Sequence, residues 1–128
     1  MSTRLESYLV EKGLCESLVG LNENMLAVVL VDDRGRIIDM KRGGSGSFDK
    51  VSEARRTALF EDLALRHIMR NEFVDEGGKE EYTITKRHRM IIFSFPINGL
   101  LLIVITDPFI DTYHLCKKVL KKIDSIRN

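Results

Sequence analysis

Apolar residues recur along the chain with two different periods, and these periods predict helices and strands. Helical spacing appears in three segments, residues 2–21, 50–74 and 107–123. Runs of β-branched and aliphatic residues fill five more segments, residues 25–31, 36–41, 81–86, 90–95 and 100–106. The order is therefore α-β-β-α-β-β-β-α, and we expect an α+β fold in which residues 1–128 form a single domain.

Turn and cap residues refine these boundaries. Gly35 can adopt positive φ, so residues 25–41 predict a β-hairpin. Asn98 and Gly99 predict a second hairpin, because a type I′ turn needs positive φ at both central positions. The helix caps are expected at side chains that accept hydrogen bonds from free backbone N–H groups, namely Ser2 or Thr3, Asp49 and Asp107.

The polarity of the strands predicts their places in a five-stranded, largely antiparallel sheet. Residues 25–31 and 100–106 are apolar throughout, so neither strand can turn a face to water and both should lie inside the sheet. The more polar residues 36–41 and 81–86 fit the edges, where charges discourage unwanted pairing. Helices must then cover both faces of the sheet.

The middle helix carries two sets of apolar residues. The larger set, which we expect to cover the sheet, is Val51, Ala54, Ala58, Ala64, Leu65, Ile68 and Met69. A second set falls on another side, where a monomer would leave it in water: Leu59, Phe60, Leu63, His67 and Val74. Exposed apolar surface of this length is typical of an interface, so the second set predicts a homodimer.

Composition and charge exclude few classes of function. Of the 128 residues, 44% are hydrophobic and 30% are charged, with a formal net charge of +1, so no global field draws the chain to nucleic acid or membranes. Residues 1–10 do not resemble a secretory signal, and no segment reaches the ~18 apolar residues of a membrane span. Cys15 and Cys116 fit neither a disulfide framework nor a zinc site. We expect reduced, buried thiols and a cytoplasmic location.

No motif predicts catalysis, and we expect no catalytic residue, cofactor or metal. His67, His88 and His114 lack the i, i+4 spacing of paired metal ligands. The glycine-rich residues 42–47 lack the pattern of a phosphate-binding loop and predict a flexible connection.

Two basic clusters could bind a partner, and the first of them is a candidate partner surface: Lys86, Arg87, His88 and Arg89 in a turn, and Lys117, Lys118, Lys121 and Lys122 on the last helix. Such residues could neutralise phosphates, which keeps a weak nucleic-acid binder as an alternative. The absence of tryptophan and of aromatic residues interleaved with the clusters makes nucleic acid unlikely as the partner.

The order of elements, the long middle helix and the Leu-Leu-Ile-Val-Ile-Thr-Asp-Pro segment at residues 101–108 resemble the roadblock/dynein light chain superfamily, related to longin and profilin-like folds. Residues 61–73 and 90–96 are similar to an uncharacterised group of stand-alone archaeal proteins. The resemblance implies a dimeric, non-catalytic adaptor or a regulator of small Ras-like GTPases. A small-ligand sensor module of profilin or GAF type remains an alternative.

Overall fold

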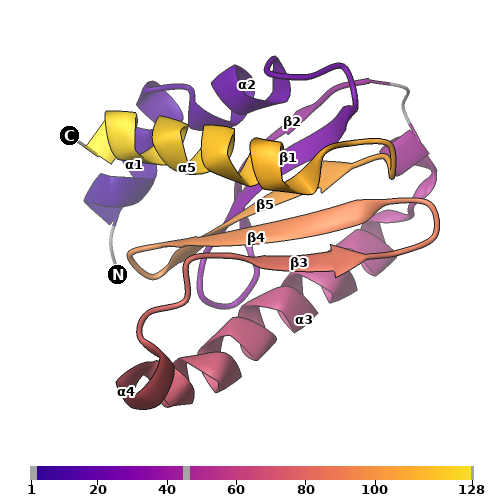
Figure 1. The fold of residues 1–128 in the computed structure, drawn as a ribbon. Helices are drawn as coiled ribbons and strands as arrows, with labels where there is room; N and C mark the ends of the chain where they lie inside the picture. The colour runs from indigo at the N-terminus through magenta and orange to yellow at the C-terminus, as the bar shows by residue number, and fades with distance from the viewer. Residues whose placement is uncertain (1–2, 45–46, 128) are drawn as a thin grey trace.

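A single five-stranded antiparallel sheet forms the centre of the computed structural model, which describes residues 3–44 and 47–127 (Figure 1). The strands are β1 (Met25–Val31), β2 (Ile37–Arg42), β3 (Thr83–Lys86), β4 (Ile91–Ile97) and β5 (Leu100–Thr106). Their order across the sheet is β2-β1-β5-β4-β3, with every neighbouring pair antiparallel. The predicted α+β class is confirmed, the apolar strands lie inside the sheet, and the polar strands β2 and β3 are its edges.

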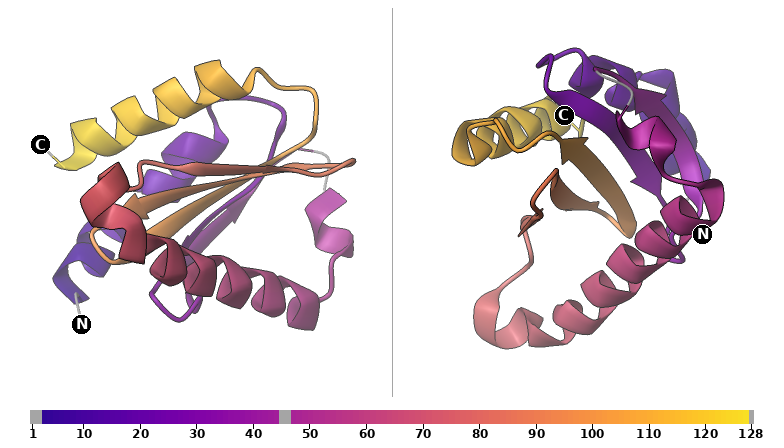
Figure 2. Two further views of the ribbon diagram at one scale, coloured as in Figure 1. Left: turned by 60° about the horizontal axis from the view of Figure 1, so that its bottom comes forward. Right: turned by 90° about the vertical axis from the view of Figure 1, so that its right-hand side faces the viewer.

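Helices cover both faces of this sheet (Figure 2). One face carries α1 (Thr3–Glu11), α2 (Leu14–Val19) and α5 (Thr112–Arg127). The other carries α3 (Glu53–Arg70), which follows a short 3-10 turn (Ser47–Lys50) and continues through another (Asn71–Phe73) into α4 (Val74–Gly77). Successive side chains along a strand point to opposite faces of the sheet, so the central strands contact both helical layers. Val28 and Val104 face α2 and α5, while Val29 and Ile103 face α3.

Both predicted hairpin turns are present. Asn98 and Gly99 connect β4 to β5 with φ values of 44° and 89°, as a type I′ turn requires. Gly35 has φ of 81° in the turn between β1 and β2. Gly43 and Gly44 follow β2 and lie so close to the backbone of Met25 that an added Cβ would approach the Met25 carbonyl oxygen to 3.1 and 2.7 Å. The rest of the predicted flexible connection falls partly on residues 45 and 46, outside the described residues.

The predicted ends of two helices need correction. The single helix predicted over residues 2–21 is two helices, because Gly13 adopts a left-handed conformation with φ of 64° and separates α1 from α2. The middle helix begins at Glu53, where the Ser52 hydroxyl accepts a hydrogen bond from the Arg55 amide at 3.3 Å. Asp49, the predicted cap, pairs with Arg42 instead. The predicted cap Ser2 lies outside the described residues.

The last helix also begins later than predicted. Asp107 Oδ1 accepts a hydrogen bond from the Phe109 amide at 2.9 Å and so closes a turn. Asp111 Oδ1 accepts from the His114 amide at 3.1 Å and caps α5 from there. Asp107 and Asp111 are both residue types that commonly cap helices, so the sequence alone does not distinguish them. The turn between them moves the start of α5 to Asp111.

The predicted faces of the middle helix are largely reversed, although Val51 and Ala64 lie against the sheet as predicted. Phe60 and Leu63, expected in an interface, are 0% and 7% exposed and pack against the sheet with Ala64. Leu59, His67 and Val74 are half-buried on the same side. Phe60 also lies against Phe48, with ring centroids 6.5 Å apart. The bulky ring fills the space between helix and sheet, which the smaller alanines of the other face could not fill.

Candidate interaction surfaces

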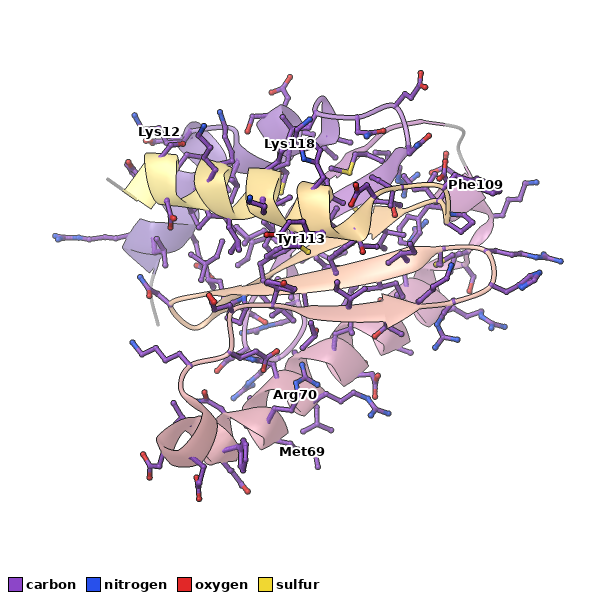
Figure 3. All side chains as sticks on the ribbon, viewed as in Figure 1. Lys12, Met69, Arg70, Phe109, Tyr113 and Lys118 are labelled. Carbon is purple, nitrogen blue, oxygen red and sulfur yellow. The ribbon has the colours of Figure 1, made fainter. Side chains whose placement is uncertain are left out.

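The side of α3 that points away from the sheet is apolar over its C-terminal half. Leu65, Ile68, Met69 and the following Phe73 are 56%, 51%, 62% and 65% exposed. Residues three and four apart share one side of a helix, so Leu65, Ile68 and Met69 form a continuous surface. We call these four residues the outer face of α3; Met69 marks it at the bottom of the molecule in Figure 3.

Ion pairs border this face. Arg66 Nε donates to Asp62 Oδ2 at 2.9 Å, one helical turn apart. Arg70 Nη2 donates to Glu80 Oε1 at 3.1 Å. An apolar centre with a charged rim is the usual anatomy of a protein interface.

Glu80 also connects the C-terminal end of α3 to the segment that leads into β3. Its side chain is 14% exposed, and its Oε2 lies 3.3 Å from His67 Nδ1 while Oε1 accepts from Arg70. His67, which the sequence analysis placed in the interface, therefore faces Glu80 on the inner side of the helix. The contact between His67 and Glu80, which are 13 residues apart in sequence, holds α3 against the segment before β3.

The neighbouring edge of the sheet is exposed as well. Among the described residues β3 pairs only with β4, which leaves its other edge without a strand partner. Ile84 and Tyr82 there are 41% and 36% exposed. Unpaired N–H and C=O groups along such an edge can accept a further strand.

The basic turn predicted as a partner surface connects β3 to β4. All four of its residues, Lys86, Arg87, His88 and Arg89, are exposed. Two exposed aromatic residues lie where β5 leads into α5: Phe109 on the connection, which is 83% exposed, and Tyr113 in the first turn of α5, which is 68% exposed. Neither was predicted from the sequence, which placed Asp107 and Pro108 at the start of the last helix; the turn that Asp107 closes instead leaves Phe109 exposed.

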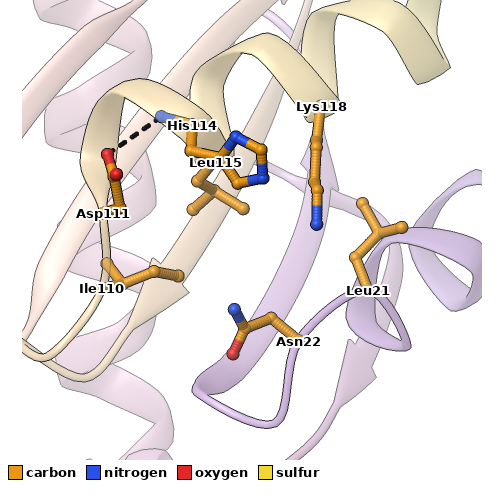
Figure 4. Close-up of a pocket in the computed structure, with 7 residues that line it drawn as sticks. All are labelled: Leu21, Asn22, Ile110, Asp111, His114, Leu115 and Lys118. Carbon is orange, nitrogen blue, oxygen red and sulfur yellow. Dashed lines mark hydrogen bonds between the residues drawn. The ribbon is translucent and has the colours of Figure 1, made fainter.

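A small pocket lies beside the start of α5 (Figure 4). Its volume of about 50 Å³ is enough for a few water molecules. Its lining residues are Leu21, Asn22, Ile110, Asp111, His114, Leu115 and Lys118. A larger hollow of about 550 Å³ beyond α3 is open to solvent and lined partly by Lys79, Glu80 and Glu81. Neither has the enclosed apolar shape of a small-ligand site.

The two cysteines are buried and unpaired, as predicted. Burial, together with the nearby Asp39 carboxylate, raises the pKa of the Cys15 thiol to about 12. Burial also raises the pKa of Cys116. Both are neutral thiols near pH 7 and poor nucleophiles. Within residues 3–44 and 47–127, no group of three or more His, Cys, Asp or Glu residues is placed to hold a metal ion, and no helix is long and apolar enough to cross a membrane.

Comparison of sequences finds no matching protein family and no matching curated protein. Comparison of structures finds clear similarity. A roadblock/LC7 domain from Streptomyces avermitilis superposes with a TM-score of 0.69 at 13% identity, over 90% of this chain and 92% of that one. MglB of Myxococcus xanthus gives 0.69 at 17% identity, over 93% and 85%. A structure described as MglB with tetrameric arrangement gives 0.63 at 10% identity, over 93% and 91%.

The matches extend over at least 85% of each chain. At such low identity they establish the fold and leave the binding residues to be argued from this chain. The chain folds as a roadblock-like domain.

Proposed function

We propose that the protein is a non-catalytic, homodimeric adaptor or regulatory domain that associates through the outer face of α3. The observation that carries the proposal is the set of three large apolar side chains, Leu65, Ile68 and Met69, each more than half exposed on one side of a helix. Isolated exposed apolar residues are common on monomers, but a continuous apolar surface of this kind is typical of an interface.

Twofold pairing of α3 with α3 would bury this surface without a second protein. A twofold axis brings the same patch of two chains together, so one apolar face is enough. The ion pairs at the rim, Arg66–Asp62 and Arg70–Glu80, would stay near solvent. The similarity to a structure described as MglB with tetrameric arrangement supports self-association of this fold.

The oligomeric state of one substituted protein tests the interface. Ile68→Glu would place a charge in the apolar contact and should raise the dimer dissociation constant by at least about tenfold, giving a folded monomer. Light scattering measures the mass and circular dichroism the fold. Arg55→Glu is the control, because Arg55 is exposed on the same helix but outside the outer face.

A wild-type protein that is monomeric at micromolar concentration would contradict the proposal. So would an Ile68→Glu protein that stays dimeric. If Arg55→Glu also dissociates the dimer, general charge on α3 matters more than the apolar face.

The regulated partner that the roadblock resemblance implies is a small Ras-like GTPase. GTP hydrolysis by purified small GTPases of the same organism should change by at least about tenfold in the presence of the protein. If none responds in either hydrolysis or nucleotide exchange, the GTPase assignment is wrong, whereas the dimer is tested separately.

The buried free thiols of Cys15 and Cys116 suit the reducing cytoplasm, where we place the protein.

A further inference from the structure

Two connections that are far apart in sequence leave the sheet at the same end. Ile91, the first residue of β4, pairs with Thr106, the last residue of β5. The basic turn before Ile91 and the connection after Thr106 therefore emerge together, as Figures 1 and 2 also show. We call this region, made of Lys86, Arg87, His88, Arg89, Phe109 and Tyr113, the basic end.

The basic side chains of the basic end pair with no acidic residue that the structure describes. Within the described part of the chain, no ion pair or side-chain hydrogen bond involves Lys86, Arg87, His88 or Arg89. Several arginines elsewhere are paired, among them Arg36 with Asp32, Arg42 with Asp49 and Arg66 with Asp62. The positive charge of the basic end is therefore available to a binding partner.

Phe109 is displayed by a backbone that is held in place. Its amide donates to Asp107 Oδ1 at 2.9 Å, and its carbonyl accepts from Asn24 Nδ2 at 3.0 Å. The side chain is nevertheless 83% exposed, the highest value among the large hydrophobic residues described. A loop whose backbone is held in this way loses little backbone entropy when a partner buries the ring.

Tyr113 extends the same region along α5. Its ring is 68% exposed and lies under Lys117, whose Nζ is 5.1 Å from the ring centroid. In Figure 3, Phe109 lies at the right-hand end of the molecule and Tyr113 lies beside α5. Tyrosine and arginine are enriched among the residues that contribute most to binding, and phenylalanine is enriched in interfaces generally.

We propose that the basic end binds an acidic segment of a partner protein, with glutamate or aspartate side chains on the arginines and an apolar side chain on Phe109. Discrete carboxylates can sit at Arg87 and Arg89 and avoid Asp107 and Asp111, the two acidic residues beside Phe109. The continuous charge of a nucleic-acid backbone or an anionic bilayer would meet those aspartates as well. The formal net charge of +1 adds no long-range attraction for either.

The inference rests on the proposed adaptor function only in that an adaptor needs a second surface. The outer face of α3 and the basic end belong to different elements. A homodimer formed through α3 would therefore present two basic ends.

Fluorescence titration tests the basic end directly. Because the protein has no tryptophan, a peptide of glutamate and phenylalanine residues with one tryptophan reports its own binding. We expect binding that weakens as salt is added. Phe109→Ser and the double substitution Arg87→Glu with Arg89→Glu should each weaken it by at least about tenfold.

Two controls separate this surface from general charge and from the dimer. Arg34→Glu removes an exposed cation at the opposite end of the sheet, in the turn after β1, and should bind the peptide like the wild type. Ile68→Glu should bind it too, even as a monomer. Circular dichroism confirms that each variant is folded.

Four results would overturn the proposal: no binding of the acidic peptide, equal binding of a peptide with lysine in place of glutamate, equal loss in Arg34→Glu, or no loss in Phe109→Ser. Tighter binding of a single-stranded oligonucleotide, or of phosphatidylglycerol vesicles, than of the acidic peptide would also overturn it and identify the other partner. A dimer that dissociates in Ile68→Glu while peptide binding fails would refute the basic end alone.

Discussion

Gly35 brings the backbone of one hairpin turn against the backbone of α3. An added Cβ would lie 2.7 Å from Glu61 Cα and 2.7 Å from the Phe60 carbonyl carbon. Real Cβ atoms do not approach backbone this closely, so the turn and the helix would have to separate. The sequence indicated the positive φ of Gly35, but the contact with α3 depends on tertiary structure that no local pattern contains.

Gly35→Ala should therefore destabilise the protein by roughly 2–4 kcal/mol, the sum of a strained backbone and an overpacked contact. Gly13→Ala is the control, because Gly13 also has positive φ, of 64°, while the nearest atom to an added Cβ is a Glu16 carboxylate oxygen at 4.0 Å. It should cost about 1 kcal/mol. Urea unfolding of both variants gives the comparison, and equal losses would mean that the close approach carries no energy.

Asp32, in the same turn, predicts a dependence of stability on pH. Burial favours its neutral form, but hydrogen bonds from the Arg36 and Arg34 amides and the Arg36 guanidinium outweigh burial and hold the pKa of the carboxyl below its usual 3.8. Because the pKa is lower in the folded state, the ionised carboxylate stabilises the fold at pH values above the usual pKa. This stabilisation is lost as the pH falls through the lowered pKa. The wild type should lose more stability than Asp32→Asn between pH 5 and pH 2, measured by urea unfolding; parallel losses would contradict this.

At the scale of elements, α3 shows why burial is harder to predict than helicity. Both of its faces carry aliphatic residues at helical spacing, so periodicity alone supported either orientation. The shape of the space under the sheet decides between them, because Phe60 fits beside Phe48 and beneath the Gly35 turn. The reversed assignment moves the candidate interface from Leu63 to Leu65, Ile68 and Met69.

This orientation predicts that two neighbouring leucines contribute very different amounts to stability. In the Ile68→Glu background, where association should not contribute, Leu63→Ala should cost about 2–4 kcal/mol because it leaves a cavity. Leu65→Ala should cost less than about 1 kcal/mol, since Leu65 is 56% exposed. Urea unfolding measures both. A larger loss for Leu65 would restore the orientation inferred from the sequence.

Features determined by neighbouring residues were predictable, and those determined by distant contacts were not. The Asn98–Gly99 turn and the apolar strands β1 and β5 follow from backbone preference and from burial on both faces. The break at Gly13 and the late start of α5 at Asp111 depend on which of several permissible caps the packing favours. The pairing of Ile91 with Thr106 at the basic end follows from the register of the Asn98–Gly99 hairpin, but the exposure of Phe109 beside it depends on the turn that delays α5.

For the molecule as a whole, the sheet separates the two candidate surfaces. α3 lies on one face, while α5 and the loop that carries Phe109 belong to the other layer and to the end of the sheet. β5 lies at the centre, hydrogen-bonded to β1 and β4 and buried along its whole length. Binding at either surface should leave this rigid centre unchanged.

Hydrogen exchange tests this separation in one experiment. In the Ile68→Glu monomer, amides of β5 should exchange slowest, because opening them requires global unfolding, while β3, an exposed four-residue edge strand, should exchange orders of magnitude faster. Dimerisation of the wild type should then slow exchange in α3 and, if the sheet edge joins the interface, in β3. Residues 107–111 should exchange at the same rate in both proteins, because their loop lies outside the interface. Slower exchange there in the wild type would show that self-association covers the basic end, and the two surfaces could not then serve two partners at once.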